Sequence, residues 1–182
     1  EITYGDSSSD VCSSDLGKER VFGVSLPSKY SSDHSKSDAA LLAKNLGINL
    51  RTIEIESVVQ GFLSATTLTG LAEENIQARV RGSLLMGLSN QEGHLVLATG
   101  NKSELAVGYS TLYGDAVGGF APIKDVFKVD VWRLAKWRNE KASGAGQTTP
   151  IPVSSIEKEP SAELRPGQKY SDQMPAYDKL DQ

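Results

Sequence analysis

A strand-like run is followed at once by side chains that suit a nucleotide site. Residues 93–100, "GHLVLATG", are apolar until they reach a Thr-Gly-Asn step that begins at Thr99. Glu104 follows close behind, and its carboxylate suits Mg²⁺, which prefers oxygen ligands and shares them with substrate phosphates. Further along, Lys124 and Lys128 are compact cations that suit phosphate charge. These residues predict binding of a phosphate-bearing ligand.

The same spacing also fits an ordinary turn between a strand and a helix. In that interpretation Asn101 or Ser103 caps the helix, and Glu104 lies in its first turn, where the helix dipole favours a carboxylate. Spacing alone favours this structural role over a metal site. Both interpretations therefore stay open at this point.

A second candidate pair lies in "EENIQARVRG". Asn75 and Arg79 are four residues apart and fall on one face of the helix that this segment predicts. An amide beside a guanidinium suits a planar, anionic or phosphate-bearing ligand. The alternative is a solvated face behind the Glu73–Glu74 pair at the helix start, and the pattern alone favours it.

Several other kinds of site are excluded by the sequence. The serine of "PSAEL" has no Gly-x-Ser-x-Gly elbow around it, which argues against a serine hydrolase. The chain has no Walker lysine loop, and "GDAVGG" does not match a dinucleotide fingerprint. A single cysteine excludes an internal disulfide and a cysteine-based metal cluster.

The elements that must position these residues follow from the apolar periodicity. We expect strands at residues 20–27, 48–55 and 93–100, and helices at residues 31–47, 56–67, 71–90 and 128–142. Gly47 is a C-cap, Asp130 is expected to cap the last helix, and the third strand should be buried on both faces. This order predicts an open α/β sheet, in which ligands bind beyond the carboxyl ends of parallel strands.

Length and composition narrow the class of protein. The 182 residues suit one domain with a proper core, and a net charge of −4 does not indicate a general nucleic-acid binder. No apolar run approaches the roughly 18 residues of a membrane helix, and no secretory signal is present. We therefore expect a cytoplasmic protein without membrane or nucleic-acid partners. The chain starts without Met and stops at Gln182, which we interpret as a fragment.

Taken together, four segments resemble one known family. They occur in the family's order: "LPSKYSSDHS", "ENIQARVRG", "LATGNKSELAVGYSTLYGDAVGGFAPIKDVFK" and "KEPSAELRPGQKYSDQMPAYDKLD". They resemble the synthetase domain of glutamine-dependent NAD synthetase, and "TGNKSELAVGYSTLYGD" is very specific to that family. The resemblance implies a Rossmann-like open parallel sheet with helices on both faces, of the adenine nucleotide alpha hydrolase type.

The resemblance also implies a reaction and its partners. The family adenylates the nicotinate carboxylate of deamido-NAD with Mg-ATP, and ammonia then displaces AMP to give NAD. The ammonia comes from glutamine through a separate nitrilase-like domain, which this chain does not contain. The family is homo-oligomeric. No protein nucleophile is needed, and the meeting of two anions calls for Mg²⁺ and a lysine to screen them.

Matching the family's motifs assigns roles to six residues. The resemblance implies ATP contacts at Thr99, Lys128 and Ser161, a magnesium ligand at Glu104, and deamido-NAD contacts at Asn75 and Arg79.

One departure from the family concerns the start of the chain. The family's phosphate loop, Ser-Gly-Gly-x-Asp-Ser, should follow the first strand and precede Leu16, but "GDSSSDVCSSDL" at residues 5–16 has no paired glycines. We expect residues 1–15 to be foreign to the family, with the first strand and phosphate-loop helix missing or corrupted. A degenerate loop or an unusual anion site are the alternatives. The synthetase domain would then span residues 16–182 and be truncated at its C-terminus.

The function of the fragment itself is therefore open. We expect little or no synthetase activity from it. One alternative is a non-catalytic nucleotide-binding or assembly subunit. Another is a different ATP-pyrophosphatase amidotransferase, such as one that makes GMP, although "GNKSELAVGY" and "PSAEL" argue against it.

Overall fold

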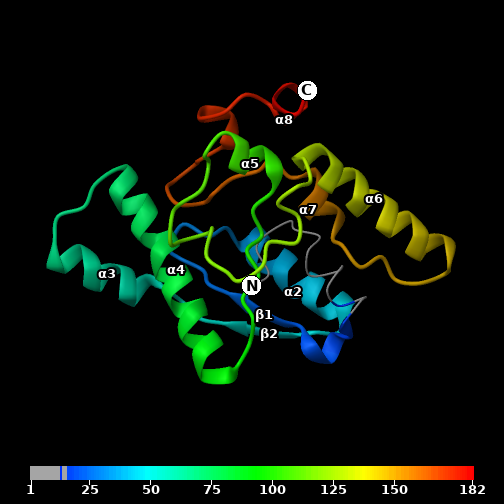
Figure 1. The fold of residues 1–182 in the computed structure, drawn as a ribbon, viewed down its shortest axis with the longest axis horizontal. Coiled ribbons are helices and arrows are strands. Elements are labelled where there is room, and N and C mark those ends of the chain that lie inside the picture. The colour runs from blue at the N-terminus through cyan, green and yellow to red at the C-terminus, as the bar shows by residue number, and fades with distance from the viewer. Residues whose placement is uncertain (1–12, 14–15) are drawn as a thin grey trace.

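The computed structural model describes Ser13 and residues 16–182 (Figure 1). The elements are, in chain order, η1 (Lys18–Arg20), β1 (Phe22–Ser25), α2 (Asp33–Leu46), β2 (Asn49–Thr52), α3 (Glu56–Ala65), α4 (Leu71–Glu92), α5 (Lys102–Ala106), α6 (Lys128–Gly144), α7 (Val153–Glu157), η2 (Tyr170–Asp172) and α8 (Tyr177–Leu180). The predictions for residues 1–12, 14 and 15 fall outside the described residues and stay predictions. In the described part of the chain, no helix is both long and apolar enough to cross a membrane.

The first strand–helix–strand unit forms as the sequence predicts. β1 and β2 pair in parallel, with Phe22 opposite Asn49, and α2 makes the crossover between them. The side chain of Ser32 accepts a hydrogen bond from the backbone N–H of Ser35 at the start of α2. Gly47 ends the helix with φ of 67°, a left-handed conformation that favours glycine.

Helices cover both faces of this small sheet (Figure 1). One apolar cluster joins α2, α6 and α7, and Leu50 of β2 packs against it. A second cluster joins α3, α4 and the end of β1, and Val24 of β1 packs against that one. Because neighbouring residues of a strand point to opposite faces, the two clusters form layers on either side. The Rossmann-like layered arrangement expected from the sequence is confirmed, and chains of known structure share it.

The third strand was predicted wrongly. Among the described residues the sheet has two strands, and the segment after α4 makes only an isolated parallel bridge from Leu97 to Phe120. Ala98 N–H donates to the Phe120 carbonyl at 2.8 Å, and Gly119 N–H donates to the Val96 carbonyl at 2.9 Å. The segment thus pairs with a loop through a single bridge, and this pairing is too short to form a β-strand. As a result, its second expected apolar face is not covered, and Leu95 is 68% exposed.

The predicted cap of α6 was also wrong. Asp130 does not cap the helix but forms an ion pair with Arg133 one turn further on, at 2.8 Å. The first N–H groups instead find partners from distant segments. The Lys128 N–H donates to Ser103 Oγ at 2.9 Å, and the Val129 N–H donates to Asp181 Oδ2 at 3.1 Å. The α6 N-terminus is therefore capped by tertiary contacts.

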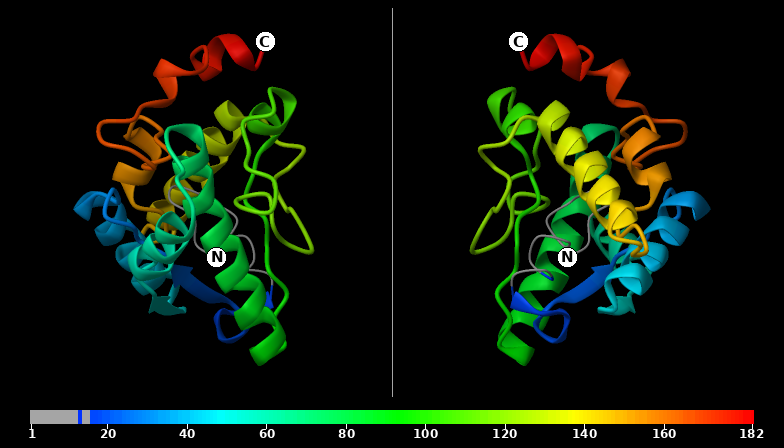
Figure 2. Two further views of the ribbon diagram at one scale, coloured as in Figure 1. Left: turned by 90° about the vertical axis from the view of Figure 1, so that its left-hand side faces the viewer. Right: turned by 90° about the vertical axis from the view of Figure 1, so that its right-hand side faces the viewer.

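The C-terminal segment returns to the end of the molecule that carries α5 (Figure 2). Ser103 of α5 donates to Asp181 Oδ1 at 2.5 Å, so one bridge joins the start of α5, the start of α6 and the end of the chain. Ser103 is only 1% exposed. This junction places Lys128 beside Glu104.

Candidate functional site

A cavity of about 450 Å³ opens beyond the carboxyl end of β1, between α2, α4, α5 and the loop after α7. This is the place where an open α/β sheet is expected to bind its ligand, and the volume suits a small molecule. Five of the six predicted site residues line the cavity: Asn75, Thr99, Glu104, Lys128 and Ser161. Arg79 lies outside its lining, and Lys124 is exposed to solvent elsewhere.

The Thr-Gly-Asn turn combines both of the roles considered for it. Asn101 caps α5 by accepting a hydrogen bond from the Glu104 N–H at 3.1 Å. In return, Glu104 Oε2 accepts one from the Asn101 N–H at 3.3 Å, which completes a capping box. The other oxygen, Oε1, lies 3.4 Å from the Tyr177 hydroxyl and 4.0 Å from Lys128 Nζ. The cap therefore orients a carboxylate at the cavity wall.

Lys128 supplies positive charge beside this carboxylate. The side chains of Lys128 and Glu104 are both only 15% exposed. The ammonium also lies 5.9 Å from the ring centroid of Trp132, one turn along α6. A compact cation that is largely shielded from solvent interacts strongly with an incoming anion.

Asn75 and Arg79 share a face of α4, as their spacing predicts, and both contact the loop at residues 110–115. Asn75 Oδ1 accepts a hydrogen bond from the Thr111 hydroxyl at 2.9 Å, and Arg79 Nε donates to the Leu112 carbonyl at 3.2 Å. Sequence reasoning missed Arg81, which lines the cavity and donates to the Leu26 carbonyl at 2.8 Å. A role for Arg79 in ligand binding stays a prediction.

Ser161 lies in the loop that closes one side of the cavity. Its hydroxyl donates to the Gln168 carbonyl at 2.5 Å and accepts a hydrogen bond from the Glu163 N–H at 3.2 Å. The Gln168 side chain returns to the same loop by accepting from the Leu164 N–H at 2.9 Å. The hydroxyl is thus held within a closed set of local contacts.

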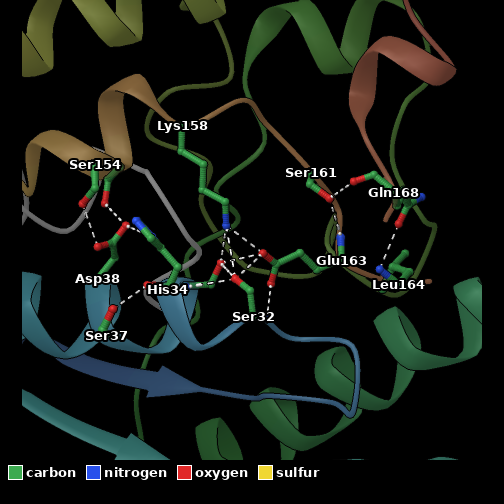
Figure 3. A network of polar contacts seen from close by, with 12 residues as sticks. Ser32, His34, Ser37, Asp38, Ser154, Lys158, Ser161, Glu163, Leu164 and Gln168 are labelled. Carbon is green, nitrogen blue, oxygen red and sulfur yellow. Dashed lines mark hydrogen bonds and ion pairs between the residues drawn. The ribbon is translucent and has the colours of Figure 1, made fainter. Parts of the chain in front are cut away.

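Sequence reasoning also missed a polar cluster at the N-terminus of α2, formed by Ser32, Ser35, Lys158 and Glu163. Figure 3 labels three of them, Ser32, Lys158 and Glu163. Glu163 accepts hydrogen bonds from Lys158 Nζ at 2.8 Å, from Ser35 Oγ at 2.7 Å, and from Ser32 Oγ at 2.8 Å and Ser32 N–H at 3.1 Å. The signal that might have found the cluster is a lysine and a glutamate flanking Ser161 in "KEPSAEL". We call these four residues the Glu163 cluster.

Opposing effects set the pKa of the Glu163 carboxyl. Burial acts to raise this pKa, but the hydrogen bonds from Lys158, Ser35 and Ser32 outweigh burial, and the pKa lies below its ordinary value. Glu163 is therefore a stable anion at neutral pH, and it faces the positive end of α2.

An aromatic wall bounds the side of the cavity near α5. The ring centroids of Tyr109 and Tyr170 are 4.7 Å apart, those of Tyr170 and Tyr177 are 6.1 Å apart, and Trp132 meets Tyr177 edge-on at 5.6 Å. Burial raises the pKa of each of the three tyrosines, most clearly for Tyr170. The wall is therefore uncharged at neutral pH and suits a flat ring.

The described residues do not form a metal site by themselves. No group of three or more His, Cys, Asp or Glu side chains that could hold a metal ion exists among them. Glu104 is a single carboxylate with a cation beside it. This donor set fits an ion that is shared with the phosphates of a ligand, and does not fit an ion that the protein holds alone.

Comparison with known proteins gives a consistent result. The family model described as NAD synthase matches residues 5–182. The glutamine-dependent NAD(+) synthetase of Synechocystis sp. is 53% identical over 172 residues, which is 91% of this chain and 30% of that protein. The enzyme of the same name from Thermotoga maritima is 51% identical over 175 residues, or 92% of this chain and 29% of that protein. The chain thus spans under a third of the length of these relatives.

Solved structures agree. The glutamine-dependent NAD+ synthetase of Acinetobacter baumannii, in complex with adenosine diphosphate, has a TM-score of 0.78 and 43% identity, with 96% of this chain and 31% of that chain covered. An NMN synthetase from Francisella tularensis has a TM-score of 0.84 and 28% identity, with 98% of this chain and 72% of that chain covered.

Proposed function

The chain belongs to the NAD synthase family, and from this premise we propose that it is the ATP-using synthetase part of a glutamine-dependent enzyme. In that enzyme, ATP adenylates the nicotinate carboxylate of deamido-NAD, and ammonia derived from glutamine converts the adenylate to NAD. The observation that carries the proposal is the single cavity that gathers five of the six residues expected from the family motifs.

ATP is the first proposed ligand of the cavity. A relative with 43% identity binds adenosine diphosphate. Thr99 and Ser161 line the cavity with their hydroxyl groups, and Lys128 supplies a cation for the phosphates. To donate to a phosphate, the Ser161 hydroxyl would exchange its hydrogen bond to the Gln168 carbonyl for one to the ligand. Glu104 would hold a magnesium ion that is bound together with ATP, and the ion would supply positive charge that screens the phosphates.

The residues of this chain act by position and charge. A carboxylate that approaches a phosphate must overcome the repulsion between two anions. The Lys128 ammonium lowers that barrier because it lies in a site with little exposure to solvent. Burial of Lys128 and Glu104 limits the water that would weaken the effect. No side chain has to act as a nucleophile, in keeping with the absence of any serine or cysteine nucleophile signature in the sequence.

Deamido-NAD is the second proposed ligand. Asn75 is placed for this by its hydrogen bond to Thr111, which holds the amide at the cavity wall. The neutral aromatic wall supplies a flat surface for a ring. Arg79 is assigned to deamido-NAD only through the family motif. A homo-oligomeric assembly is likewise proposed from the family alone. The cytoplasmic location that we expect from the sequence is kept as a proposal.

The polypeptide as printed should make little or no NAD. Its sequence contains no Ser-Gly-Gly-x-Asp-Ser segment, the phosphate loop by which backbone N–H groups wrap pyrophosphate in the family. NAD formation by this chain from Mg-ATP, deamido-NAD and ammonia, at a rate normal for a synthetase, would contradict the expectation.

A substitution in a longer glutamine-dependent enzyme that contains this domain tests the proposed reaction. Glu104→Gln keeps both capping hydrogen bonds sterically possible but removes the negative charge. We expect folding to be retained and formation of the deamido-NAD adenylate to be abolished, as measured by pyrophosphate release. Unchanged activity would remove Glu104 from the metal site. Amidation of XMP in place of deamido-NAD would favour a different amidotransferase.

A further inference from the structure

Hydrogen bonds hold the loop at residues 158–168 on both sides of the cavity. On one side, Glu163 contacts the start of α2 through the Glu163 cluster (Figure 3). On the other side, the Gln77 amide of α4 donates to the Leu164 carbonyl at 2.9 Å, and the Gln168 amide donates to Glu74 Oε2 at 3.2 Å. The loop therefore bridges α2 and α4, and the cavity lies beneath it.

The contacts of Glu163 are unusual for a loop carboxylate. Three different side chains and one backbone N–H donate to its two oxygens, and its own side chain is only 12% exposed. The backbone at Glu163 has φ of 50°, in the left-handed region that non-glycine residues seldom adopt. The surrounding contacts hold this conformation in place.

Glu163 is also coupled to Ser161. The Glu163 N–H donates to Ser161 Oγ at 3.2 Å, which leaves the serine hydroxyl hydrogen to donate to the Gln168 carbonyl at 2.5 Å. The carboxylate of the same residue holds Lys158 Nζ at 2.8 Å, and Lys158 lines the cavity. Glu163 thus contacts two polar residues at the cavity wall, Lys158 through its carboxylate and Ser161 through its backbone N–H.

We propose that Glu163 is a positioning residue: its carboxylate fixes the loop at residues 158–168 against the start of α2, and so places Ser161 and Lys158 for the phosphates of a nucleotide. The proposal rests on the proposed function for its ligand. It does not require Glu163 to touch that ligand. Loss of the carboxylate charge releases the loop, and nucleotide binding weakens through the displacement of Ser161 and Lys158.

Two measurements on the 182-residue chain test this. The first is hydrogen exchange of the Glu163 and Leu164 backbone amides, measured in the absence of any ligand. The second is the Kd of Mg-ATP by calorimetry. Because hydrogen bonds to a charged group are stronger than those to a neutral one, Glu163→Gln should speed exchange and raise Kd by about tenfold or more. The matched control for the exchange measurement is Glu159→Gln, since Glu159 lies on the same loop and its carboxylate bonds Ser171 and Lys169. Because Glu159 also lines the cavity, this control is not used for the Kd.

A second background separates positioning from direct contact. If Glu163 acts through Ser161 and Lys158, Glu163→Gln should change Kd by less than about twofold in a chain that carries both Ser161→Ala and Lys158→Ala, because both groups that it positions are already gone. An undiminished effect in that background would overturn the proposal and assign Glu163 a contact of its own with the nucleotide. Equal exchange in the Glu163→Gln and Glu159→Gln chains would also overturn it.

A milder variant and a separate outcome complete the test. Should Glu163→Gln fail to fold, as judged by circular dichroism, Ser35→Ala removes one donor, and faster exchange at Glu163 is again expected. Unchanged exchange in Ser35→Ala would then refute the proposal. If the unmodified chain binds no Mg-ATP, the proposed function fails for this chain, while the exchange measurements still decide whether Glu163 anchors the loop.

Discussion

Helix α4 packs closely against the loop at residues 111–117, and this packing predicts different effects for alanine at Gly82 and at Gly87. A Cβ atom at Gly82 would lie 2.6 Å from the Tyr113 carbonyl oxygen and 3.1 Å from that of Gly114. Both neighbours are backbone atoms, so neither can swing aside. Gly87 lies on the same helix, five residues further on, and a Cβ there would meet nothing within 4 Å. The two sites form a matched pair for substitution by alanine.

The two substitutions should change the free energy of unfolding in opposite directions. Gly87→Ala should stabilise the chain by about 0.5–1 kcal/mol, because alanine loses less backbone entropy in a helix. Gly82→Ala has the same gain, but the forced shift of the loop backbone costs about 1–3 kcal/mol, as overpacking usually does. The two variants should therefore differ by about 1–3 kcal/mol, or about 2–12 °C in Tm for a chain of this size.

Urea unfolding followed by tryptophan fluorescence and by circular dichroism measures this difference. The expected order of stability is Gly87→Ala, then the unmodified chain, then Gly82→Ala. A Gly82→Ala chain as stable as Gly87→Ala would refute the close packing of α4 on this loop. The packing also matters for the site, because a shifted loop would draw Thr111 away from Asn75 and break their 2.9 Å hydrogen bond.

Three further predictions concern other contacts. Ser103→Ala and Asp181→Asn should each destabilise the chain to urea by about 1 kcal/mol as lost caps of α6, and together by less than the sum because Ser103 bonds Asp181. Since the pKa of Glu163 lies below its ordinary 4.5, its stabilising effect is present above that pH and is lost as pH falls through the lower value of the folded state, so acid titration of Glu163→Gln should be flatter. Since burial raises the pKa of Tyr170 above 10.0, stability should fall as pH rises beyond 10.0, and the Tyr170 part of the tyrosinate absorbance, measured as the difference from a Tyr170→Phe chain, should appear only with unfolding.

Much of the fold was predictable because its signals are local. The spacing of apolar residues in α2, the Ser32 cap and the left-handed Gly47 all depend on neighbours within a few residues. The parallel pairing of β1 and β2 follows from the handedness of a strand–helix–strand unit. The third strand failed because a strand exists only through its partners, and the partner of Leu97 proved to be a loop residue, Phe120.

The candidate site, too, could be predicted from the sequence only in part. Residue types and motif order were sufficient to indicate Thr99, Glu104 and Lys128, and all three line the cavity. The sequence could not decide between a cap and a ligand for Glu104, since a capping box and a cavity-facing oxygen are compatible only in three dimensions.

Consecutive residues were thus enough to predict the four longest of the described helices, the first parallel pair and the family, because periodicity, caps and motifs are local features of the chain. Only the tertiary structure decided that Ser103 and Asp181 cap α6, and that Glu163 reaches Ser32 across 131 positions of the chain. Such contacts join segments whose separation in sequence carries no periodic signal. Their geometry is set by how the layers pack, and no local pattern reports it.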